Sequence, residues 1–299
     1  VRQFFFMKQF ILCVGCQKGG TTWLYEQLLK SKKFNGGPLK EYHVFDALYI
    51  NDWIKRGLRD SLLRILQQGE TPIELLLNLN LFHTDLRIYY DYFNYLWKQN
   101  SDITTVGDFT PDYCGLNHLV FRKIRKNLED RGFSVKVVFL MRDPFERFWS
   151  MVRMNKKIMN SDFAIDGIVE AWKTTHEDLV LPKFDDEEGL TRVPEELDYF
   201  TRYDLTIKNL EKAFDRDQIY YGFYEDLFTD ESINNLSKFL NVETEIFDKN
   251  DHVNESPKLE KISMSTIKSV CDRYHEVYKF VDQRFDVREK WKSFDYVRL

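Results

Sequence analysis

The chain has 299 residues, of which 43% are hydrophobic and 30% are charged, and its formal net charge at pH 7 is −5. This composition is that of a globular protein with a full hydrophobic core, and it lacks the basic excess of a general nucleic-acid-binding protein. The first residues are apolar, but Lys8 and Gln9 interrupt them before they reach the roughly 18 residues of a membrane span. We therefore expect a soluble, cytoplasmic protein without a nucleic-acid partner; a processed signal or an N-terminal anchor outside this sequence stays open.

The chain contains four cysteines, too few for a disulfide framework in a protein of this length. Cys13 and Cys16 form a C-x-x-C pattern, but Cys13 falls inside an expected strand, and a zinc or redox site would need a second ligand pair. We interpret the cysteines as buried or incidental thiols in a reducing compartment, and we expect no metal.

Strands and helices are expected to alternate along the chain. Continuous apolar runs predict strands at 10–14, 135–141 and 218–224. Apolar residues at helical spacing predict helices at 21–30, 58–66, 86–97, 116–128, 199–214 and 231–240, and another that begins at Pro144. The acidic stretch 183–189 predicts an exposed loop.

This alternation predicts an α/β fold in which a parallel sheet is flanked by helices and binds ligands at the carboxyl ends of its strands. No linker rich in Pro, Gly and Ser and no internal repeat divides the chain, so we expect a single domain over residues 1–299.

The sequence QKGGTTWL directly follows the first expected strand. Gly19 and Gly20 would let the backbone approach an anion at a helix start, Thr21 and Thr22 add hydroxyl donors, and Lys18 adds a mobile charge. An ATP-binding loop would place its lysine directly before the hydroxyl residue, whereas here two glycines intervene. We interpret the segment as an anion site; the alternative is a glycine turn with a solvated lysine.

The sequence RDPFERFWS follows the strand expected at 135–141. Arg142 stands at the end of that strand, and Ser150 lies eight residues later on the following helix. An arginine there can fork onto a phosphate beside a serine donor, while Asp143 caps the helix that Pro144 opens.

The sequence KEYHVFD contains a lysine, a carboxylate and an imidazole within four residues. In an extended segment Glu41 and His43 point to the same side, so they could form a general base with Lys40 as an electrostatic helper. A solvated Lys–Glu pair and a structural histidine are the alternative.

Together these motifs resemble the sulfotransferases that use 3′-phosphoadenosine 5′-phosphosulfate (PAPS), and most of all their heparan-sulfate or carbohydrate-type branch. QKGGTTWL is similar to the family's 5′-phosphosulfate loop, RDPFERFWS to its 3′-phosphate motif and KEYHVFD to the K-E-x-H-F-F-D segment of heparan-type enzymes. GDFTPDY (107–113) resembles G-E-K-[ST]-P-x-Y, and YEDL (224–227) resembles a recurrent later element. The matches follow the family order from residue 10 to about residue 240.

The resemblance implies a P-loop-like sulfotransferase fold and in-line transfer of a sulfuryl group from PAPS to a hydroxyl or amine, with 3′-phosphoadenosine 5′-phosphate (PAP) as the product. It implies Lys18 at the leaving oxygen, Glu41 as the base and His43 as its support, without a metal. The implied nucleotide contacts are Lys18, Gly19, Gly20, Thr21 and Thr22 at the 5′ end and Arg142 and Ser150 at the 3′-phosphate. Trp23 aligns with a tryptophan that stacks on adenine; core packing is its alternative.

The sequence departs from the family at two places. Phe109 stands where heparan-type enzymes carry a second lysine, so either Lys40 supplies that charge or the site has one cation fewer. The loop that closes over the 3′-phosphate is expected at 252–258, through Asn254, Ser256 and Lys258.

The acceptor is the least defined partner. Segments 47–105 and 155–200 are expected to form its cleft, and the KEYHVFD resemblance favours a carbohydrate; a lipid, a peptide tyrosine or a carrier-bound metabolite stays open. Arg153, Lys156 and Lys157 either attract an anionic acceptor or form a solvated helix face. Two rival functions remain: a P-loop nucleotide kinase or phosphotransferase, and a non-catalytic nucleotide-binding protein on the same fold.

Overall fold

The computed structural model describes residues 8–50, 80–159, 197–251 and 262–297. Within these residues a parallel sheet of five strands runs in the order β2-β3-β1-β4-β5. Its strands are β1 (Gln9–Cys13), β2 (Phe34–Asn35), β3 (Thr105–Asp108), β4 (Ser134–Met141) and β5 (Ile219–Phe223). Because all pairs are parallel, the carboxyl ends of the strands lie along one edge of the sheet.

Alternating residues of each central strand enter two hydrophobic cores, one on each face of the sheet. In β1, Phe10 and Leu12 face one core, whereas Ile11 and Cys13 face the other. This period of two is the geometry of an extended strand, and both faces are apolar because helices cover both. The continuous apolar runs of β1 and β4 are therefore the consequence of a sheet buried on both sides.

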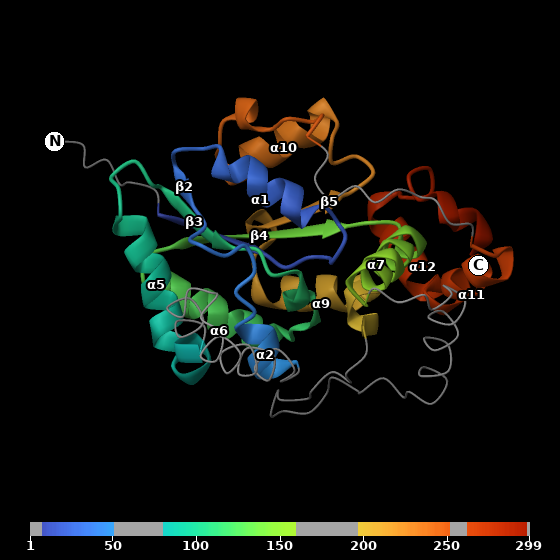
Figure 1. Ribbon diagram of the computed structural model, residues 1–299, viewed down its shortest axis with the longest axis horizontal. Coiled ribbons are helices and arrows are strands. Elements are labelled where there is room, and N and C mark those ends of the chain that lie inside the picture. Colours follow the sequence, from blue (N-terminus) through green and yellow to red (C-terminus); the bar gives the residue numbers. More distant parts are fainter. Residues whose placement is uncertain (1–7, 51–79, 160–196, 252–261, 298–299) are drawn as a thin grey trace.

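Helices cover both faces and the carboxyl edge of the sheet. Figure 1 shows α1 and α10 on one face, α5, α6 and α9 on the other, and α7, α11 and α12 beyond the end toward which β4 points. The helices are α1 (Thr21–Leu29), α2 (Phe45–Tyr49), α5 (Leu86–Lys98), α6 (His118–Glu129), α7 (Pro144–Met159), α9 (Tyr203–Ala213), α10 (Asp230–Leu240), α11 (Met264–Arg273) and α12 (His275–Phe285). Short 3₁₀ helices lie at Pro111–Gly115, Leu197–Thr201, Arg216–Gln218, Thr244–Ile246 and Lys292–Tyr296.

The parallel α/β architecture and most predicted elements are confirmed within one or two residues of their expected bounds. The prediction of one helix at 199–214 was wrong, because the backbone of Arg202 (ψ 61) leaves the helical region between Leu197–Thr201 and α9. Strands β2 and β3 and helices α2, α11 and α12 were not predicted. The helix expected at 58–66 and the loops expected at 183–189 and 252–258 lie outside the described residues, as does much of both segments expected to form the acceptor cleft.

In the part of the chain that the structure describes, no helix is both long enough and apolar enough to cross a membrane. The four cysteines are buried and free, in agreement with their interpretation as buried thiols.

Phe109, which occupies the position of the expected second lysine, belongs to the core beneath α1. It is fully buried, and its ring packs edge-on against Tyr25 and Phe34 at centroid distances of 5.2 and 5.9 Å. The side chain therefore lies in an apolar core, where a charge would be buried without solvent.

We expect Phe109→Leu to lower the free energy of unfolding by about 1–2 kcal/mol, because it removes part of a packed ring. Phe109→Lys should lower it by roughly 4 kcal/mol or more, because it also places an ammonium group in an apolar core. Urea unfolding followed by circular dichroism measures both values. Equal losses for the two variants would show that the position tolerates a charge.

Candidate active site

The sequence motifs meet at the carboxyl edge of the sheet. Lys18 lies in the loop after β1, Arg142 directly follows β4, and the segment 109–113 follows β3. Strands β3, β1 and β4 are neighbours, so these three loops are adjacent. This edge is where open parallel sheets bind their ligands.

The loop after β1 continues the pairing with β4 before it turns into α1. Val14 N–H donates to the carbonyl of Val138 (3.0 Å), and Leu140 N–H donates to the carbonyl of Gly15 (2.7 Å). A Cβ atom on Gly19 would lie 2.7 Å from the Leu140 carbonyl oxygen, so only glycine fits there. Gly20 has φ 97 and opens α1, whose first-turn N–H groups have no partner within the helix.

Two site residues have an unusual backbone. Lys18 (φ 68) and His43 (φ 51) lie in the left-handed region although neither is glycine. The other described non-glycine residues with positive φ are Asn241 and Asp286, which end α10 and α12 as ordinary helix caps. Backbone strain of this kind concentrates at functional sites.

Arg142 joins the two anion motifs. Its Nη1 donates to the carbonyl of Lys18 (3.2 Å), and its guanidinium lies 4.2 Å from the ring centroid of Tyr224. The side chain is 11% exposed, and its buried Nε has no hydrogen-bond partner. A buried donor without a partner is costly, so this geometry suits an anion that supplies the missing acceptor.

Asp143 caps α7 as predicted, because its carboxylate accepts a hydrogen bond from Phe145 N–H (3.0 Å). The same carboxylate accepts bonds from Tyr278 Oη (3.1 Å) and from Ser293 N–H (3.0 Å). The C-terminal helices are thereby fastened to the turn that carries Arg142.

Positive charge accumulates around Lys18. Burial lowers the pKa of its ammonium group, and the charges of Arg142, Arg153 and Lys40 lower it further, whereas the charge of Glu41 raises it. Lys18 Nζ also approaches the Met154 sulfur on α7 (3.8 Å). The loop lysine thus lies within electrostatic reach of both other motifs.

The KEYHVFD segment forms a compact charged cluster. Lys40 Nζ contacts Glu41 Oε1, and His43 Nε2 lies 3.3 Å from Glu41 Oε2. On its other side His43 Nδ1 donates to Asp46 Oδ2 (2.7 Å). Burial alone would raise the pKa of Glu41, but His43 and Lys40 lower it to about 2. Burial alone would lower the pKa of His43, but Asp46 and Glu41 raise it to about 11, so the imidazole is protonated.

Asp112 completes this cluster. One ligand atom from each of Glu41, His43 and Asp112 lies within 4.8 Å of the others, and Asp112 accepts a hydrogen bond from Tyr199 Oη (3.2 Å). Burial and the charge of Asp46 raise the pKa of Asp112 to about 7. Such residue types also occur in metal sites, but here the cations in contact with Glu41 are the Lys40 ammonium and the His43 imidazolium.

The turn after β3 holds the cluster in place. Asp108 is fully buried and accepts hydrogen bonds from the hydroxyls of Thr110 (2.6 Å), Tyr89 and Tyr113 (both 2.8 Å). The Thr110 oxygen in turn accepts the N–H of Tyr42 (3.0 Å), the residue between Glu41 and His43. Burial raises the pKa of Asp108 to about 6.

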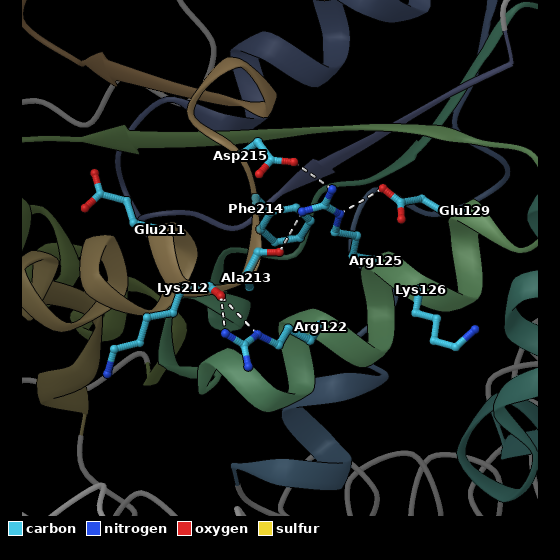
Figure 2. A pocket seen from close by; sticks show the side chains of 9 residues that line it. All are labelled: Arg122, Arg125, Lys126, Glu129, Glu211, Lys212, Ala213, Phe214 and Asp215. Atoms are coloured by element: carbon cyan, nitrogen blue, oxygen red, sulfur yellow. Dashed lines mark hydrogen bonds and ion pairs between the residues drawn. The ribbon is translucent and has the colours of Figure 1, made fainter.

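A recess of about 300 Å³ lies elsewhere, between α6 and α9. Figure 2 shows that its arginines are already engaged: Arg122 donates to the Lys212 carbonyl, and Arg125 contacts Glu129 and Asp215. These segments precede β4 and β5, so the recess lies toward the amino ends of the strands. Arg122 and Arg125 on α6 bond to the end of α9 through the carbonyls of Lys212 and Ala213. The recess is separate from the charged cluster at the carboxyl edge.

A model of the sulfotransferase domain family matches residues 8–292. The chain belongs to this family. Its fold is similar to that of a sulfotransferase from Alicyclobacillus acidocaldarius, with 15% identity, a TM-score of 0.58 and coverage of 92% of this chain and 94% of that chain.

Two further structures are similar at lower TM-scores. The sulfotransferase domain of a Synechococcus olefin synthase has 16% identity and a TM-score of 0.47 over 92% of this chain and 93% of its own. A mouse sulfotransferase complexed with PAP has 14% identity and a TM-score of 0.43 over 97% of this chain and 89% of its own. No curated protein sequence matches the chain significantly.

Several of the predicted nucleotide residues are buried, among them Gly19 and Thr21 in the loop and at the start of α1. The Trp23 indole is 2% exposed, packs against Phe228 and Phe247 and donates to the Asp248 carbonyl (3.1 Å), which favours the core-packing alternative. Ser150 is 6% exposed on α7. Thr21 and Thr22 lie in the first turn of α1.

Sequence reasoning missed Asp112 and Asp46 as members of the cluster. Asp46 is 3% exposed in the first turn of α2 and contacts His43, which precedes that helix and has a left-handed backbone, so helical spacing does not describe the contact. Asp112 lies 69 positions beyond His43, and no sequence pattern indicated that the two meet.

We expect the effect of Asp112→Asn on stability to depend on pH. Because the folded-state pKa is about 7, above the ordinary value of 3.8, ionisation of this carboxyl costs stability as the pH rises from 4 to 7. The variant should melt about 2–5 °C above the wild type at pH 8 and close to it at pH 4. Differential scanning calorimetry measures this, with the exposed Asp102→Asn as a control. A difference that does not grow with pH would contradict the charge assignment.

Proposed function

We propose that the protein transfers a sulfuryl group from PAPS to an acceptor hydroxyl or amine, with Lys18 at the leaving oxygen and Glu41 as the base. The observation that carries this proposal is that both side chains lie in loops at the carboxyl edge of one parallel sheet. Lys18 follows β1, and the segment of Glu41 follows β2 and bonds to the end of β3, where the Lys40 carbonyl accepts Phe109 N–H (3.2 Å). The charge of Glu41 also acts on Lys18. Sulfuryl transfer needs both a cation at the leaving group and a base on the acceptor, held in one geometry.

The residues present fit a nucleotide with phosphate groups at both ends. Helix α1 begins at Thr21 directly after Gly19 and Gly20, and the N–H groups of its first turn have no partner within the helix, which suits the 5′ end. The buried Arg142 Nε without a hydrogen-bond partner suits the 3′-phosphate, with Ser150 as its second donor. When bound, PAPS supplies an activated sulfuryl group and a nucleotide leaving group.

Lys18 stabilises the negative charge that develops on the leaving oxygen. Its pKa is lowered by burial and by neighbouring cations, so an anion beside it relieves that repulsion and keeps the ammonium protonated. The positive charges of Lys18, Arg142, Arg153 and Lys40 are held near one another in the free protein. Charges that are positioned before the reaction begins can stabilise a transition state electrostatically.

Glu41 is ionised at neutral pH and so can receive the acceptor proton. In the free protein Lys40 and His43 hold its pKa near 2, which makes it a weak base. An acceptor that displaces Lys40 from Glu41 removes one of these contacts and strengthens the base. His43 stays hydrogen-bonded to Asp46 and orients the carboxylate from the other side.

A carbohydrate acceptor is the finer part of this proposal, and the resemblance of KEYHVFD to heparan-type enzymes supports it. The rival phosphotransferase function is less well supported, because Lys18 precedes both glycines instead of the hydroxyl residue. A non-catalytic role is less well supported because Lys18 and Glu41, the residues that the proposed transfer needs, are both present.

Glu41→Gln should keep nucleotide affinity within about twofold, because the proposed phosphate contacts do not include Glu41, and should lower turnover by roughly 100-fold or more. Turnover is the formation of PAP from PAPS in the presence of a panel of mono- and disaccharides and amino sugars. The matched control is Glu26→Gln, an exposed residue on α1. A Glu41→Gln variant as active as the wild type would remove Glu41 from its role, and phosphate transfer from magnesium-ATP would favour the rival function.

A further inference from the structure

The family resemblance leads one to expect a second lysine in the site. Phe109 occupies that position and is buried in the core beneath α1. Lys40, the proposed substitute, has its ammonium group in contact with Glu41 Oε1. The charge of the expected lysine would therefore have to come from another cation near Lys18.

Arg153 lies on the part of α7 that Lys18 touches. Lys18 Nζ approaches the sulfur of Met154, the next residue along the helix (3.8 Å). Arg153 follows Ser150 by three residues, so the two share one face of α7. The Arg153 guanidinium lies 5.6 Å from the ring centroid of Trp149. The Trp149 ring is 4% exposed, and this cation–π contact helps to fix the position of the guanidinium.

We propose that Arg153 is the second cation at the 5′ end of the nucleotide, where it binds the 5′-phosphate and the transferring group beside Lys18. This assignment rests on the proposed function. It means that α7 contacts both ends of the nucleotide, because Ser150 would bind the 3′-phosphate and Arg153 would bind the 5′ end. It replaces the expectation that Arg153 attracts an anionic acceptor or is merely solvated. The side chains of Lys156 and Lys157 lie outside those described.

The charge balance around Lys18 supports the assignment. Burial lowers the pKa of Lys18, and the charges of Arg142, Arg153 and Lys40 lower it further, so several cations converge on the loop. The charge of Glu41 acts on Lys18 in the opposite direction, and Glu146 on α7 lies 3.5 Å from Arg142. Like charges in proximity are unfavourable unless an anion neutralises them. A nucleotide with phosphate at both ends carries enough negative charge to do so, and a planar guanidinium can bind an oxyanion through two donors.

The test separates the two ends of the nucleotide by calorimetry with PAP and with adenosine 3′-phosphate, which lacks the 5′ group. Arg153→Gln should weaken PAP binding roughly 10- to 100-fold, the loss expected for charge-assisted hydrogen bonds, and leave adenosine 3′-phosphate affinity unchanged. Arg153→Lys should recover part of the loss. Arg142→Gln should weaken both ligands, because both carry the 3′-phosphate. The control is Arg87→Gln, whose side chain is 81% exposed.

Two results would overturn the assignment: unchanged PAP affinity in Arg153→Gln, or an equal loss for both ligands in a variant that melts like the wild type. The proposed function fails separately. If the wild-type protein binds PAP no better than AMP, the 3′-phosphate is not recognised, and the proposal that PAPS is the sulfuryl donor is wrong. If it does discriminate while Arg153→Gln behaves as wild type, only the Arg153 assignment falls.

Discussion

The pairing of β1 with β4 is the constraint on which the site depends. It continues past the end of β1, where Leu140 N–H donates to the Gly15 carbonyl (2.7 Å), so the anion loop is fixed to the strand that ends at Arg142. Arg142 then returns a hydrogen bond to the Lys18 carbonyl across 124 positions of sequence (3.2 Å). Two loops that are distant in the chain thus lie against each other and form the surface on which the proposed nucleotide would bind. A surface whose parts are already held together loses less entropy when a ligand binds.

The same edge of the sheet separates two charge environments. Around Lys18, basic side chains gather and lower its pKa, whereas around His43 the carboxylates of Glu41, Asp46 and Asp112 gather and raise the pKa of the imidazole. A donor that is strongly anionic fits the first environment, and an acceptor hydroxyl or amine that must lose a proton fits the second. Lys40 contacts Glu41 at the boundary between them, so it is the residue that both partners would influence.

The sequence predicted those parts of the structure that local chemistry determines. The apolar runs of β1 and β4 and the glycine–threonine start of α1 were recognisable because burial and turn geometry demand those residue types. Strand β3 was not, because Thr105–Asp108 contains a glycine and an aspartate that strands usually avoid; the glycine is required since a Cβ on Gly107 would lie 2.6 Å from the Ile11 carbonyl oxygen. Asp112 and Arg153 acquire their roles only when separate loops and helices meet, which no local pattern reveals.

Recognition of the 3′-phosphate can be measured by calorimetric binding of PAP to the wild-type protein, beside AMP and magnesium-ATP. We expect PAP to bind without a metal and at least about tenfold more tightly than AMP, because a buried guanidinium would meet the 3′-phosphate. Preference for magnesium-ATP, or equal affinity for PAP and AMP, would rule out PAPS as the donor and leave the Lys18 loop as a candidate anion site for a different ligand.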